Sequence, residues 1–366
     1  MVYIVLYIMV SIILLLIVLG EIVFRIVFKL KNRRFYEPVD KIEFNKSHFI
    51  SHPYLPVAYK TNCTIPEEKV ESPITHDKLI YPSMKTNSYG LLFDEKLVSK
   101  NNLIIFLGNC TFGTGYYYKE VFYSLPYYLN KKIGDNYTFI PVARGGWTSM
   151  DIIFYLYTTL VKLKPKAIVF GFGLNDLIPA LAPEFKSDYS HLFRNLSESK
   201  LIRITRDILP KIKFWHLYEY LLDKYMGTGN INYDLNRLIR KSYPLFSNNF
   251  NLTVENQNIR SMIGICKEHN ILPILTTYLY YVYDEIKNKP TYKKLKKGVL
   301  IENVNIRRTA DKCHVPIIDI EKNFQFDREF FIDETHLSPD GMEKYSQIFI
   351  PKFKEIMENV SGKDFY

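Results

Sequence analysis

Short apolar runs alternate with amphipathic stretches along the chain from residue 102 onward. Each run has the length of a strand and is apolar throughout, as strands buried on both faces of a parallel sheet are. The stretches between them repeat their apolar residues at helical spacing. This alternation predicts right-handed crossovers and an open parallel sheet covered by helices on both faces. The predicted strands are residues 103–107, 137–142, 167–172, 271–276 and 315–320, and the helices between them are 119–131, 148–162, 254–268 and 301–312.

A last helix is predicted after residue 338. Ser338 suits the N-cap and Pro339 the first helical position, and apolar residues follow at helical spacing. Directly before it, Asp333 stands three residues ahead of His336. When a carboxylate holds one ring nitrogen of a histidine, the other ring nitrogen can take a proton from a nucleophile. Taken alone, such a pair is more often two unrelated polar residues, so its meaning depends on the rest of the chain.

The chain opens with a nearly continuous apolar segment. Residues 2–19 are almost all apolar, and the segment extends to residue 28 if Glu21 and Arg25 lie at the interface. A bilayer takes about 20 helical residues, so the sequence predicts a retained single-pass transmembrane anchor over residues 1–28. The basic cluster at 29–34 favours a cytoplasmic body, whereas an uncleaved anchor of an envelope enzyme usually has the opposite charge bias. The side of the membrane therefore stays open.

Two further divisions are predicted. Residues 29–101 mix Pro, Asn, Ser and charge with short apolar runs and are expected to form a juxtamembrane lead-in packed on the main domain, residues 102–360. The third and fourth predicted strands are separated by about a hundred residues, far more than one crossover needs. We expect a helical insertion at about residues 184–250, serving equally well as a lid or as passive packing.

Composition narrows the classes of function. Hydrophobic content of 47% excludes wholesale disorder, and the charge of +10 is spread over the chain without a nucleic-acid motif. Aromatic content of 15% fits a solid core, sugar-facing surfaces or a coding bias. Neither zinc-type spacing nor a phosphate loop is present, so no metal or cofactor is expected. The four cysteines lack the spacing of a disulfide framework (Cys63, Cys110, Cys266 and Cys313).

Three motifs follow the first three predicted strands. The first, Gly108–Gly115, is a small-residue turn that would expose one side chain at the sheet edge, and Cys110 is its natural occupant. A thiolate is favoured near a helix N-terminus and a histidine, although a lone Cys is usually a small buried residue closing a strand. The second, Ala143–Ser149, can present backbone donors.

The third motif is Gly173-Leu174-Asn175-Asp176. An Asn on a tight turn at a strand end can donate its side-chain N–H to a developing oxyanion, or it can be chosen for the turn itself. Asp176 is expected to brace the turn or cap a helix. Carboxyl ends of parallel strands share one edge, so the three motifs and the Asp333–His336 pair should meet there.

These motifs resemble those of the SGNH/GDSL hydrolases over roughly residues 102–353, excluding the insertion. Gly173–Asp176 is similar to the family's G-x-N-D block and Asp333-x-x-His336 to its D-x-x-H block. The resemblance implies a flavodoxin-like three-layer α/β/α sandwich, with His336 as general base, Asp333 as its orienting carboxylate and Asn175 as an oxyanion donor.

The resemblance also implies roles at two altered blocks. The family's serine block falls on Gly108–Gly113, where no serine stands, so either Cys110 or Asn109 occupies the nucleophile position. The family's oxyanion glycine falls on Ala143, which with the Cys110 N–H would complete the oxyanion site. Gly108, Asn109 and Gly173 would line the bound substrate. The runs 88–90 and 188–190 look like those of membrane-anchored members associated with cell-surface polysaccharides.

The leading hypothesis is a membrane-anchored esterase or acyl-transfer enzyme that acts on ester-linked acyl groups of a carbohydrate or cell-envelope substrate, without a cofactor. The first alternative is a catalytically inactive relative that binds a glycan or a partner protein through the same cleft. The second is a structural member of an envelope assembly.

Overall fold

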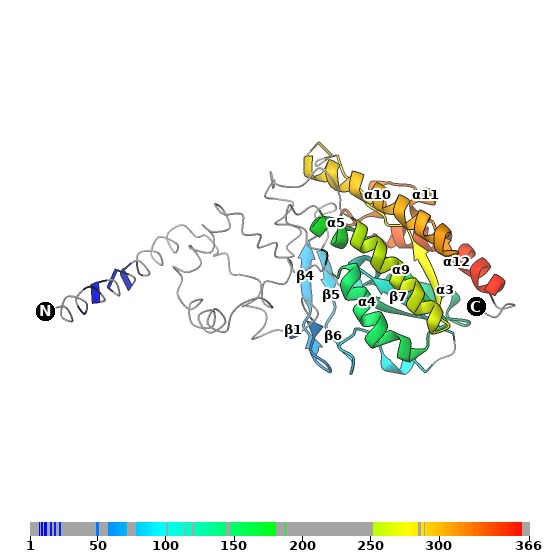
Figure 1. Ribbon diagram of the computed structural model, residues 1–366, viewed down its shortest axis with the longest axis horizontal. Coiled ribbons are helices and arrows are strands. Elements are labelled where there is room, and N and C mark those ends of the chain that lie inside the picture. The colour runs from blue at the N-terminus through cyan, green and yellow to red at the C-terminus, as the bar shows by residue number, and fades with distance from the viewer. Residues whose placement is uncertain are drawn as a thin grey trace. The chain divides into compact units, whose positions relative to one another are not determined.

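A computed structural model of the chain describes most of residues 49–180 and 252–360 (Figure 1). Nearly all of the predicted insertion and most of the predicted anchor lie outside the described residues. Among the described residues, no helix is both long enough and apolar enough to cross a membrane. The described ranges are 49–50, 58–71, 78–99, 102–113, 115–118, 121–143, 147–180, 187, 252–284, 287–288 and 290–360, with single positions between 7 and 22.

The central sheet of the described region has five parallel strands in the order β10-β7-β11-β12-β13. In chain order this is 2-1-3-4-5, the flavodoxin-like doubly wound arrangement, whose switch point lies between β7 and β11. The predicted parallel sheet is therefore confirmed. The strands are β7 (Leu103–Gly108), β10 (Thr138–Ala143), β11 (Ala167–Gly171), β12 (Leu272–Thr276) and β13 (Ile317–Ile318).

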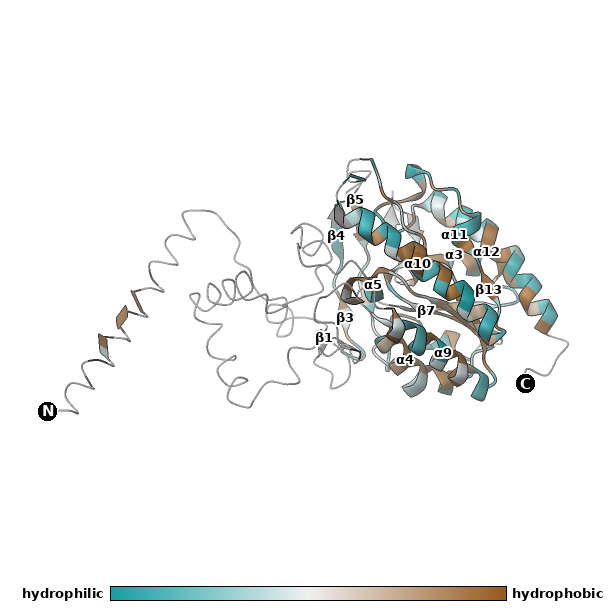
Figure 2. Ribbon diagram, turned by 45° about the horizontal axis from the view of Figure 1, so that its top comes forward, coloured by the Kyte–Doolittle hydropathy of each residue, from teal (hydrophilic) through white to brown (hydrophobic). Residues whose placement is uncertain are grey.

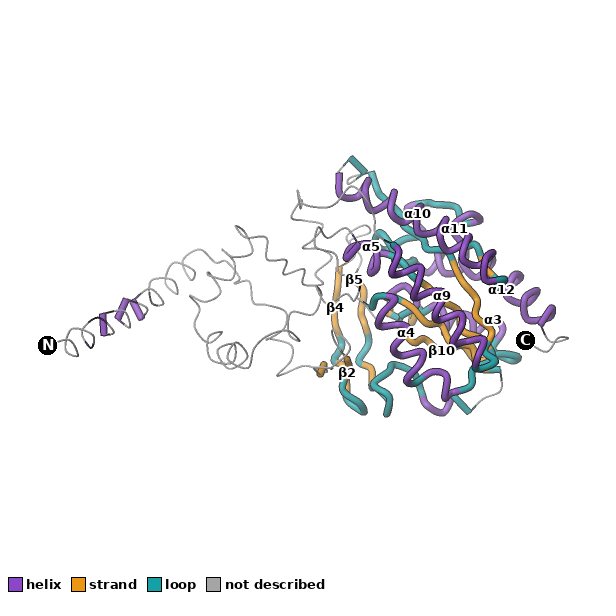
Figure 3. The backbone as a smooth tube through the Cα atoms, in the orientation of Figure 1, coloured by secondary structure: helices purple, strands orange, loops and turns teal. Residues whose placement is uncertain are grey.

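Helices cover the sheet on both faces (Figures 1 and 3). Helices α4, α9 and α10 pack side by side on one face, and α3 and α12 pack together on the other. The three layers follow from the right-handed crossovers between parallel strands. The helices are α3 (Leu125–Ile133), α4 (Ser149–Thr158), α5 (Leu174–Ala180), α9 (Thr253–Glu268), α10 (Pro290–Cys313), α11 (Ile320–Asn323) and α12 (Pro339–Val360), with 3-10 turns η1 (Glu95–Leu97), η2 (Cys110–Phe112), η3 (Leu160–Leu163) and η6 (Arg328–Phe330).

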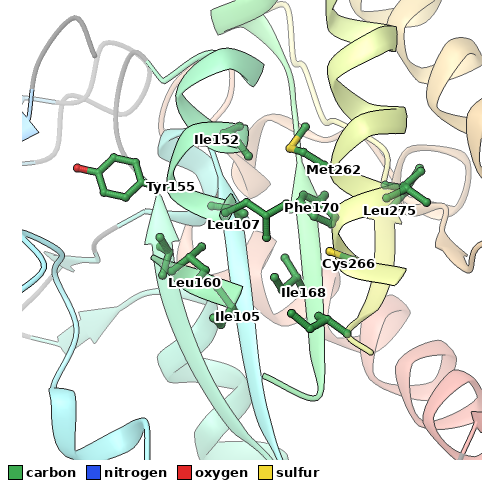
Figure 4. Close-up of a cluster of buried hydrophobic side chains, with 14 of the residues drawn as sticks. Ile105, Leu107, Ile152, Tyr155, Leu160, Ile168, Phe170, Met262, Cys266 and Leu275 are labelled. Atoms are coloured by element: carbon green, nitrogen blue, oxygen red, sulfur yellow. The ribbon is translucent and has the colours of Figure 1, made fainter. Parts of the chain in front are cut away.

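Successive side chains of β7 enter different halves of the core. Ile105 and Leu107 join Ile152 and Met262 in the cluster beneath α4 and α9 (Figure 4). Phe106 points to the other face, where its ring centroid lies 5.4 Å from that of Phe349 on α12. Both sides of the strand are thus buried, which explains its unbroken apolar run. The helices instead alternate hydrophobic and hydrophilic residues (Figure 2), because each has only one buried face.

One predicted helix is wrong at its start. Residues 119–131 were expected to be helical, but Val121–Tyr123 forms strand β9, and helix α3 begins only at Leu125. Ser124 caps that helix by accepting a hydrogen bond from the Tyr127 N–H at 3.2 Å. The Tyr- and Val-rich segment before Ser124 has a high strand propensity and pairs locally, which overrides the helical pattern.

A second sheet joins the lead-in to the first motif. It is antiparallel and comprises β4 (Glu68–Glu71), β5 (Lys78–Tyr81), β8 (Tyr116–Tyr118) and β9 (Val121–Tyr123). Ile80 on β5 pairs with Tyr117 on β8, so this part of the lead-in is held against the segment that follows Cys110. Two smaller antiparallel pairs are β1 (Phe49–Ile50) with β2 (Ala58–Tyr59) and β3 (Thr64–Ile65) with β6 (Met84–Lys85).

Candidate active site

The ends of three adjacent strands lie level with one another at the carboxyl edge of the sheet. Gly108 on β7 is in register with Ala143 on β10 and with Gly171 on β11. A Cβ atom on Gly108 would collide with the Gly171 carbonyl oxygen, so glycine permits the close approach of the two strands. This edge brings the first three sequence motifs together. The structure places Gly108 in the β7 strand and describes the second motif only at Ala143 and from Trp147 onward.

Asn109 braces the turn that follows β7. Its Nδ2 donates to the Phe172 carbonyl oxygen at 2.9 Å, and its Oδ1 accepts from the Thr111 N–H at 3.1 Å and the Thr111 hydroxyl at 2.7 Å. The side chain is 1% exposed. Because both ends of this amide are bound to the protein, the Asn109 side chain is committed to the turn. Cys110 is the first residue of the 3-10 turn that Asn109 caps, and it is half-buried.

The loop that carries His336 is built around the Asp333 carboxylate. Asp333 Oδ1 accepts from the N–H groups of Thr335 at 2.8 Å and His336 at 2.7 Å. Asp333 Oδ2 lies 2.7 Å from His336 Nδ1, which must donate because a carboxylate only accepts. The N–H of Ile332 donates to the His336 carbonyl oxygen at 2.9 Å and closes the loop. With Nδ1 fixed in this way, Nε2 is the nitrogen left for a proton transfer.

Charge at the site is concentrated on His336 and Asp333. Burial lowers the pKa of His336, but the charges of Asp333 and Cys110 and hydrogen bonds with both side chains outweigh burial, so this pKa lies well above its usual value. Burial raises the pKa of Asp333, yet the charge of His336 and the hydrogen bonds from His336 and Thr335 hold it below the usual range. Cys110 thus lies close enough to His336 for its charge to influence the pKa of His336, and the Asp333 carboxylate favours the imidazolium form of His336.

Asn175 places an unpartnered donor at the same edge. It lies in the first turn of α5, two residues after Gly173, whose φ of +153° requires a glycine. The Asn175 Nδ2 is buried and has no hydrogen-bond partner among the described residues. A buried donor without a partner costs roughly 1–3 kcal/mol, so its retention is explained if a ligand supplies the acceptor.

Asp176 has the bracing role that the sequence predicted. Its two carboxylate oxygens accept from the Ser149 N–H at 3.0 and 2.9 Å, and Oδ1 also accepts from the Ser149 hydroxyl at 2.7 Å. Thr148 forms a capping box with Asp151 beside this contact, so the start of α4 is fixed to the third motif. Asp176 therefore has a structural role, and its neighbour Asn175 remains the candidate for a catalytic one.

The structure adds three tyrosines that the sequence motifs missed. Tyr278, just after β12, is 5% exposed and close enough to Cys110 and Asp333 to feel their charges. Tyr81 on β5 feels the charges of His336, Asp333 and Cys110 in the same way. Tyr116 on β8 donates its hydroxyl to the Leu337 carbonyl oxygen at 2.6 Å. The place of Tyr278 after the fourth strand is the one sequence signal that could have found it, whereas no local signal pointed to Tyr81 or Tyr116.

The fold and the site together define the class: a flavodoxin-like α/β/α protein with a Cys-His-Asp constellation at the carboxyl edge of its sheet. In its Gly-x-Asn-Asp and Asp-x-x-His motifs the chain resembles the SGNH/GDSL hydrolases. Among the described residues, no group of three or more His, Cys, Asp and Glu side chains could hold a metal ion.

Comparisons with known proteins give structural neighbours only. No protein-family model and no curated protein matches the chain. A GDSL-like lipase from Bacteroides thetaiotaomicron matches with 14% identity and a TM-score of 0.39, covering 73% of this chain and 91% of its own. A lipase/acylhydrolase from Enterococcus faecalis matches with 18% identity and a TM-score of 0.41, covering 69% and 96%. An acetyl xylan esterase from Geobacillus stearothermophilus matches with 13% identity and a TM-score of 0.40, covering 70% and 96%. The fold assignment rests on the strand order and register of this chain itself.

Proposed function

We propose that the protein is an esterase or acyl-transfer enzyme of SGNH type whose nucleophile is the Cys110 thiolate. The observation that carries this proposal is the chain of contacts at the sheet edge. Cys110 lies close enough to His336 for its charge to raise the pKa of His336, and His336 Nδ1 is held 2.7 Å from Asp333. A nucleophile, a base and a group that orients the base are the recurring parts of covalent acyl transfer.

The first half of the reaction forms a thioester. The Cys110 proton resides on His336, and the thiolate sulfur attacks the acyl carbonyl carbon while the carbonyl electrons move to oxygen. Asn175 Nδ2 and the backbone N–H groups of Cys110 and Ala143 receive this oxyanion. When the intermediate collapses, the bond to the alcohol oxygen breaks, and the His336 imidazolium gives its proton to the departing alcohol.

The second half releases the acyl group. Neutral His336 takes a proton from water or from an acceptor hydroxyl, which attacks the thioester carbonyl. Collapse of this second intermediate expels the Cys110 thiolate and leaves the imidazolium beside it. Water as the acceptor gives hydrolysis, and a sugar hydroxyl gives acyl transfer.

The raised pKa of His336 is consistent with a cysteine nucleophile, because the charges of Asp333 and Cys110 both raise it. A serine nucleophile needs a neutral imidazole to remove its proton. A thiolate is already ionised and needs His336 as a counter-ion first and as an acid later. The tight Asp333–His336 pair and the replacement of serine are therefore mutually consistent.

The substrate and location are part of the proposal. We propose ester-linked acyl groups on a carbohydrate or other cell-envelope substrate, supported by the likeness of residues 88–90 to polysaccharide-associated members. The buried and half-buried rings of Tyr81, Tyr116 and Tyr278 around the site are of the kind that lines ligand pockets. Attachment to a membrane through residues 1–28 is proposed from their apolar sequence alone.

The test compares the full-length protein with Cys110→Ala and His336→Ala on short-chain aryl esters. We expect turnover by the wild type and a loss of at least about a thousandfold in each variant, as for members of other catalytic triads. The control Cys313→Ala changes a cysteine at the far end of α10 and should leave turnover unchanged. Equal inactivity of the wild type and both variants overturns the proposal and favours an inactive relative that binds a glycan or a partner.

A further inference from the structure

The second sheet and the histidine loop are joined by one buried side chain, Tyr116 on β8. Its hydroxyl donates to the Leu337 carbonyl oxygen at 2.6 Å, although the two residues stand 221 positions apart in the chain. Tyr116 follows Cys110 by six residues, and Leu337 directly follows His336. We propose that Tyr116 is a positioning residue for the proposed reaction, which ties the segment that carries Cys110 to the loop that carries His336. The inference rests on the proposed function and adds a residue outside the sequence motifs.

The segment between Cys110 and Tyr116 is short and is fixed at its start. Cys110 opens the 3-10 turn η2, and the ring centroid of Phe112 in this turn lies 4.9 Å from that of Phe106 on β7. The chain then enters β8, where Tyr116 pairs with Tyr123 on β9. Since only five residues separate Cys110 from Tyr116, the position of β8 limits where the thiol can lie.

The Leu337 carbonyl belongs to the backbone that closes the histidine loop. Leu337 forms an antiparallel bridge with Phe331, and the Ile332 N–H donates to the His336 carbonyl oxygen at 2.9 Å. The residues on either side of the histidine loop are thus joined to each other. The tyrosine hydroxyl holds this joined end of the loop from β8.

Apolar packing supports the same contact. The Tyr116 side chain is 4% exposed and shares a buried cluster with Leu79 on β5, Ile332 in the histidine loop and Met342 on α12. Leu337 packs against this cluster. The cluster brings the second sheet, the histidine loop and the last helix together, but apolar contacts are not directional. The hydrogen bond from the Tyr116 hydroxyl adds the direction.

This contact supplies what the hydrogen bonds inside the loop cannot. Asp333 fixes the His336 ring relative to the loop, with Nδ1 held 2.7 Å from Oδ2. That bond does not set where the loop lies relative to Cys110, which comes from a distant part of the chain. The hydrogen bond from Tyr116 acts on this second distance, in which an error of about 1 Å can cost on the order of a hundredfold in rate.

The experiment compares the full-length wild type with Tyr116→Phe, which removes the hydroxyl and keeps the buried ring. For an aryl ester we expect kcat to fall about tenfold, the rate equivalent of one hydrogen bond. KM should stay unchanged, because the hydroxyl bonds to the protein backbone.

A second readout follows Cys110 without any ester turnover. The rate at which iodoacetamide alkylates Cys110 is measured against pH by peptide mass spectrometry. In Tyr116→Phe we expect the pH midpoint of alkylation to rise toward that of a free thiol, because a displaced imidazolium stabilises the thiolate less. A residue that only stabilised the fold would leave this midpoint where it is.

Two variants serve as matched controls. Tyr280→Phe makes the same chemical change at another buried tyrosine, whose hydroxyl has no hydrogen-bond partner among the described residues. Ser346→Ala removes a hydroxyl that donates to the Glu343 carbonyl oxygen at 2.7 Å inside α12, so it loses the same kind of bond outside the histidine loop. Both should leave kcat within about twofold and the alkylation midpoint unchanged. A loss in Ser346→Ala equal to that in Tyr116→Phe would overturn the positioning role.

The two readouts separate this inference from the proposed function. If the wild type turns over no ester, the proposed function fails, and the alkylation of Cys110 still tests Tyr116. An unchanged alkylation midpoint in Tyr116→Phe, or an unchanged kcat in a protein that turns over the ester, overturns the inference and leaves the proposed function intact.

Discussion

Two asparagines stand at the carboxyl edge of the same sheet, and their surroundings are opposite. Asn109, after β7, uses both ends of its amide in hydrogen bonds to Phe172 and Thr111. Asn175, after β11, keeps a buried Nδ2 that has no partner among the described residues. The Asn109 side chain and the Asn175 Nδ2 are both shielded from water, so the cost of an unmade hydrogen bond falls on Asn175 alone.

The difference shows how to tell a structural residue from a candidate functional one at such an edge. A fold that satisfies Asn109 completely could have satisfied Asn175 as well. The donor of Asn175 instead lies on the turn that Tyr278 and Asp176 fix from either side. We infer that Asn175 is held ready for an acceptor that arrives with the substrate, and that Asn109 builds the turn that presents Cys110.

Among the variants that test this comparison, the largest expected effect is that of Asn175→Ala on turnover. Removal of one oxyanion donor should lower kcat by about a hundredfold to a thousandfold. Its melting temperature should stay the same or rise slightly, because no hydrogen bond within the described protein is lost. Steady-state kinetics and thermal melts of one preparation measure both. A large drop in melting temperature would mean that Asn175 has a structural partner after all.

Asn109→Ala should show the reverse pattern. It breaks hydrogen bonds to Phe172 and Thr111 in a buried turn, so we expect a loss of about 1–3 kcal/mol in the free energy of unfolding. Denaturant unfolding measures it. The control Asn130→Ala removes a similar pair of bonds to Phe139 at a distance from the site and should lower stability without lowering the kcat of the folded fraction. An unchanged free energy of unfolding in Asn109→Ala would contradict the structural role of Asn109 and with it the difference between the two asparagines.

The smallest effect on turnover is expected at another buried polar group, Glu302. This residue tests whether burial without a hydrogen-bond partner is enough to identify a functional residue. Glu302 on α10 is fully buried beside Glu255 on α9. Neither carboxyl oxygen of Glu302 has a hydrogen-bond partner of normal geometry among the described residues. Burial raises the pKa of Glu302 to about 8. The folded state thus keeps a proton that the unfolded chain releases above about pH 4.3.

Stability should therefore fall as the pH rises from about 4.5 toward 8, by about 1.4 kcal/mol per pH unit for this proton. Glu302→Gln should reduce that slope by one proton and leave kcat unchanged at neutral pH. Unfolding free energies at several pH values measure the slope, and the surface variant Glu355→Gln serves as control. A loss of turnover in Glu302→Gln would contradict this account, because a buried group without a partner would then matter for turnover even away from the sheet edge that carries Asn175.

Features that depend on nearby residues could be predicted from the sequence. The five parallel strands follow from unbroken apolar runs, and the Asp333–His336 contact spans only three residues. The bracing role of Asp176 was also foreseen from its place on a strand-end turn. The helix expected from residue 119 failed because pairing between β8 and β9 outweighed its periodicity.

Features that depend on distant segments could not be predicted. From the sequence alone, Asn109 is an alternative nucleophile. Its structural role cannot be predicted, because its partner, the Phe172 carbonyl, lies 63 residues away and comes near only when β7 and β11 pair. Tyr278 meets Gly173 only when β11 and β12 pair. Tyr81 reaches the site through a sheet between the lead-in and β8, for which the sequence carries no motif.

The most direct test of the central claim is to look for an acyl group on Cys110. The full-length protein is mixed with an aryl acetate, quenched in acid during turnover and mapped by peptide mass spectrometry. We expect one acetyl group on the peptide that contains Cys110 in the wild type and none in Cys110→Ala. We also expect a higher steady-state level of this acetyl group in Asp333→Asn, because the variant should slow release of the thioester more than its formation. Turnover by the wild type with the acetyl group on another residue, or turnover that persists in Cys110→Ala, would contradict the claim that Cys110 is the nucleophile.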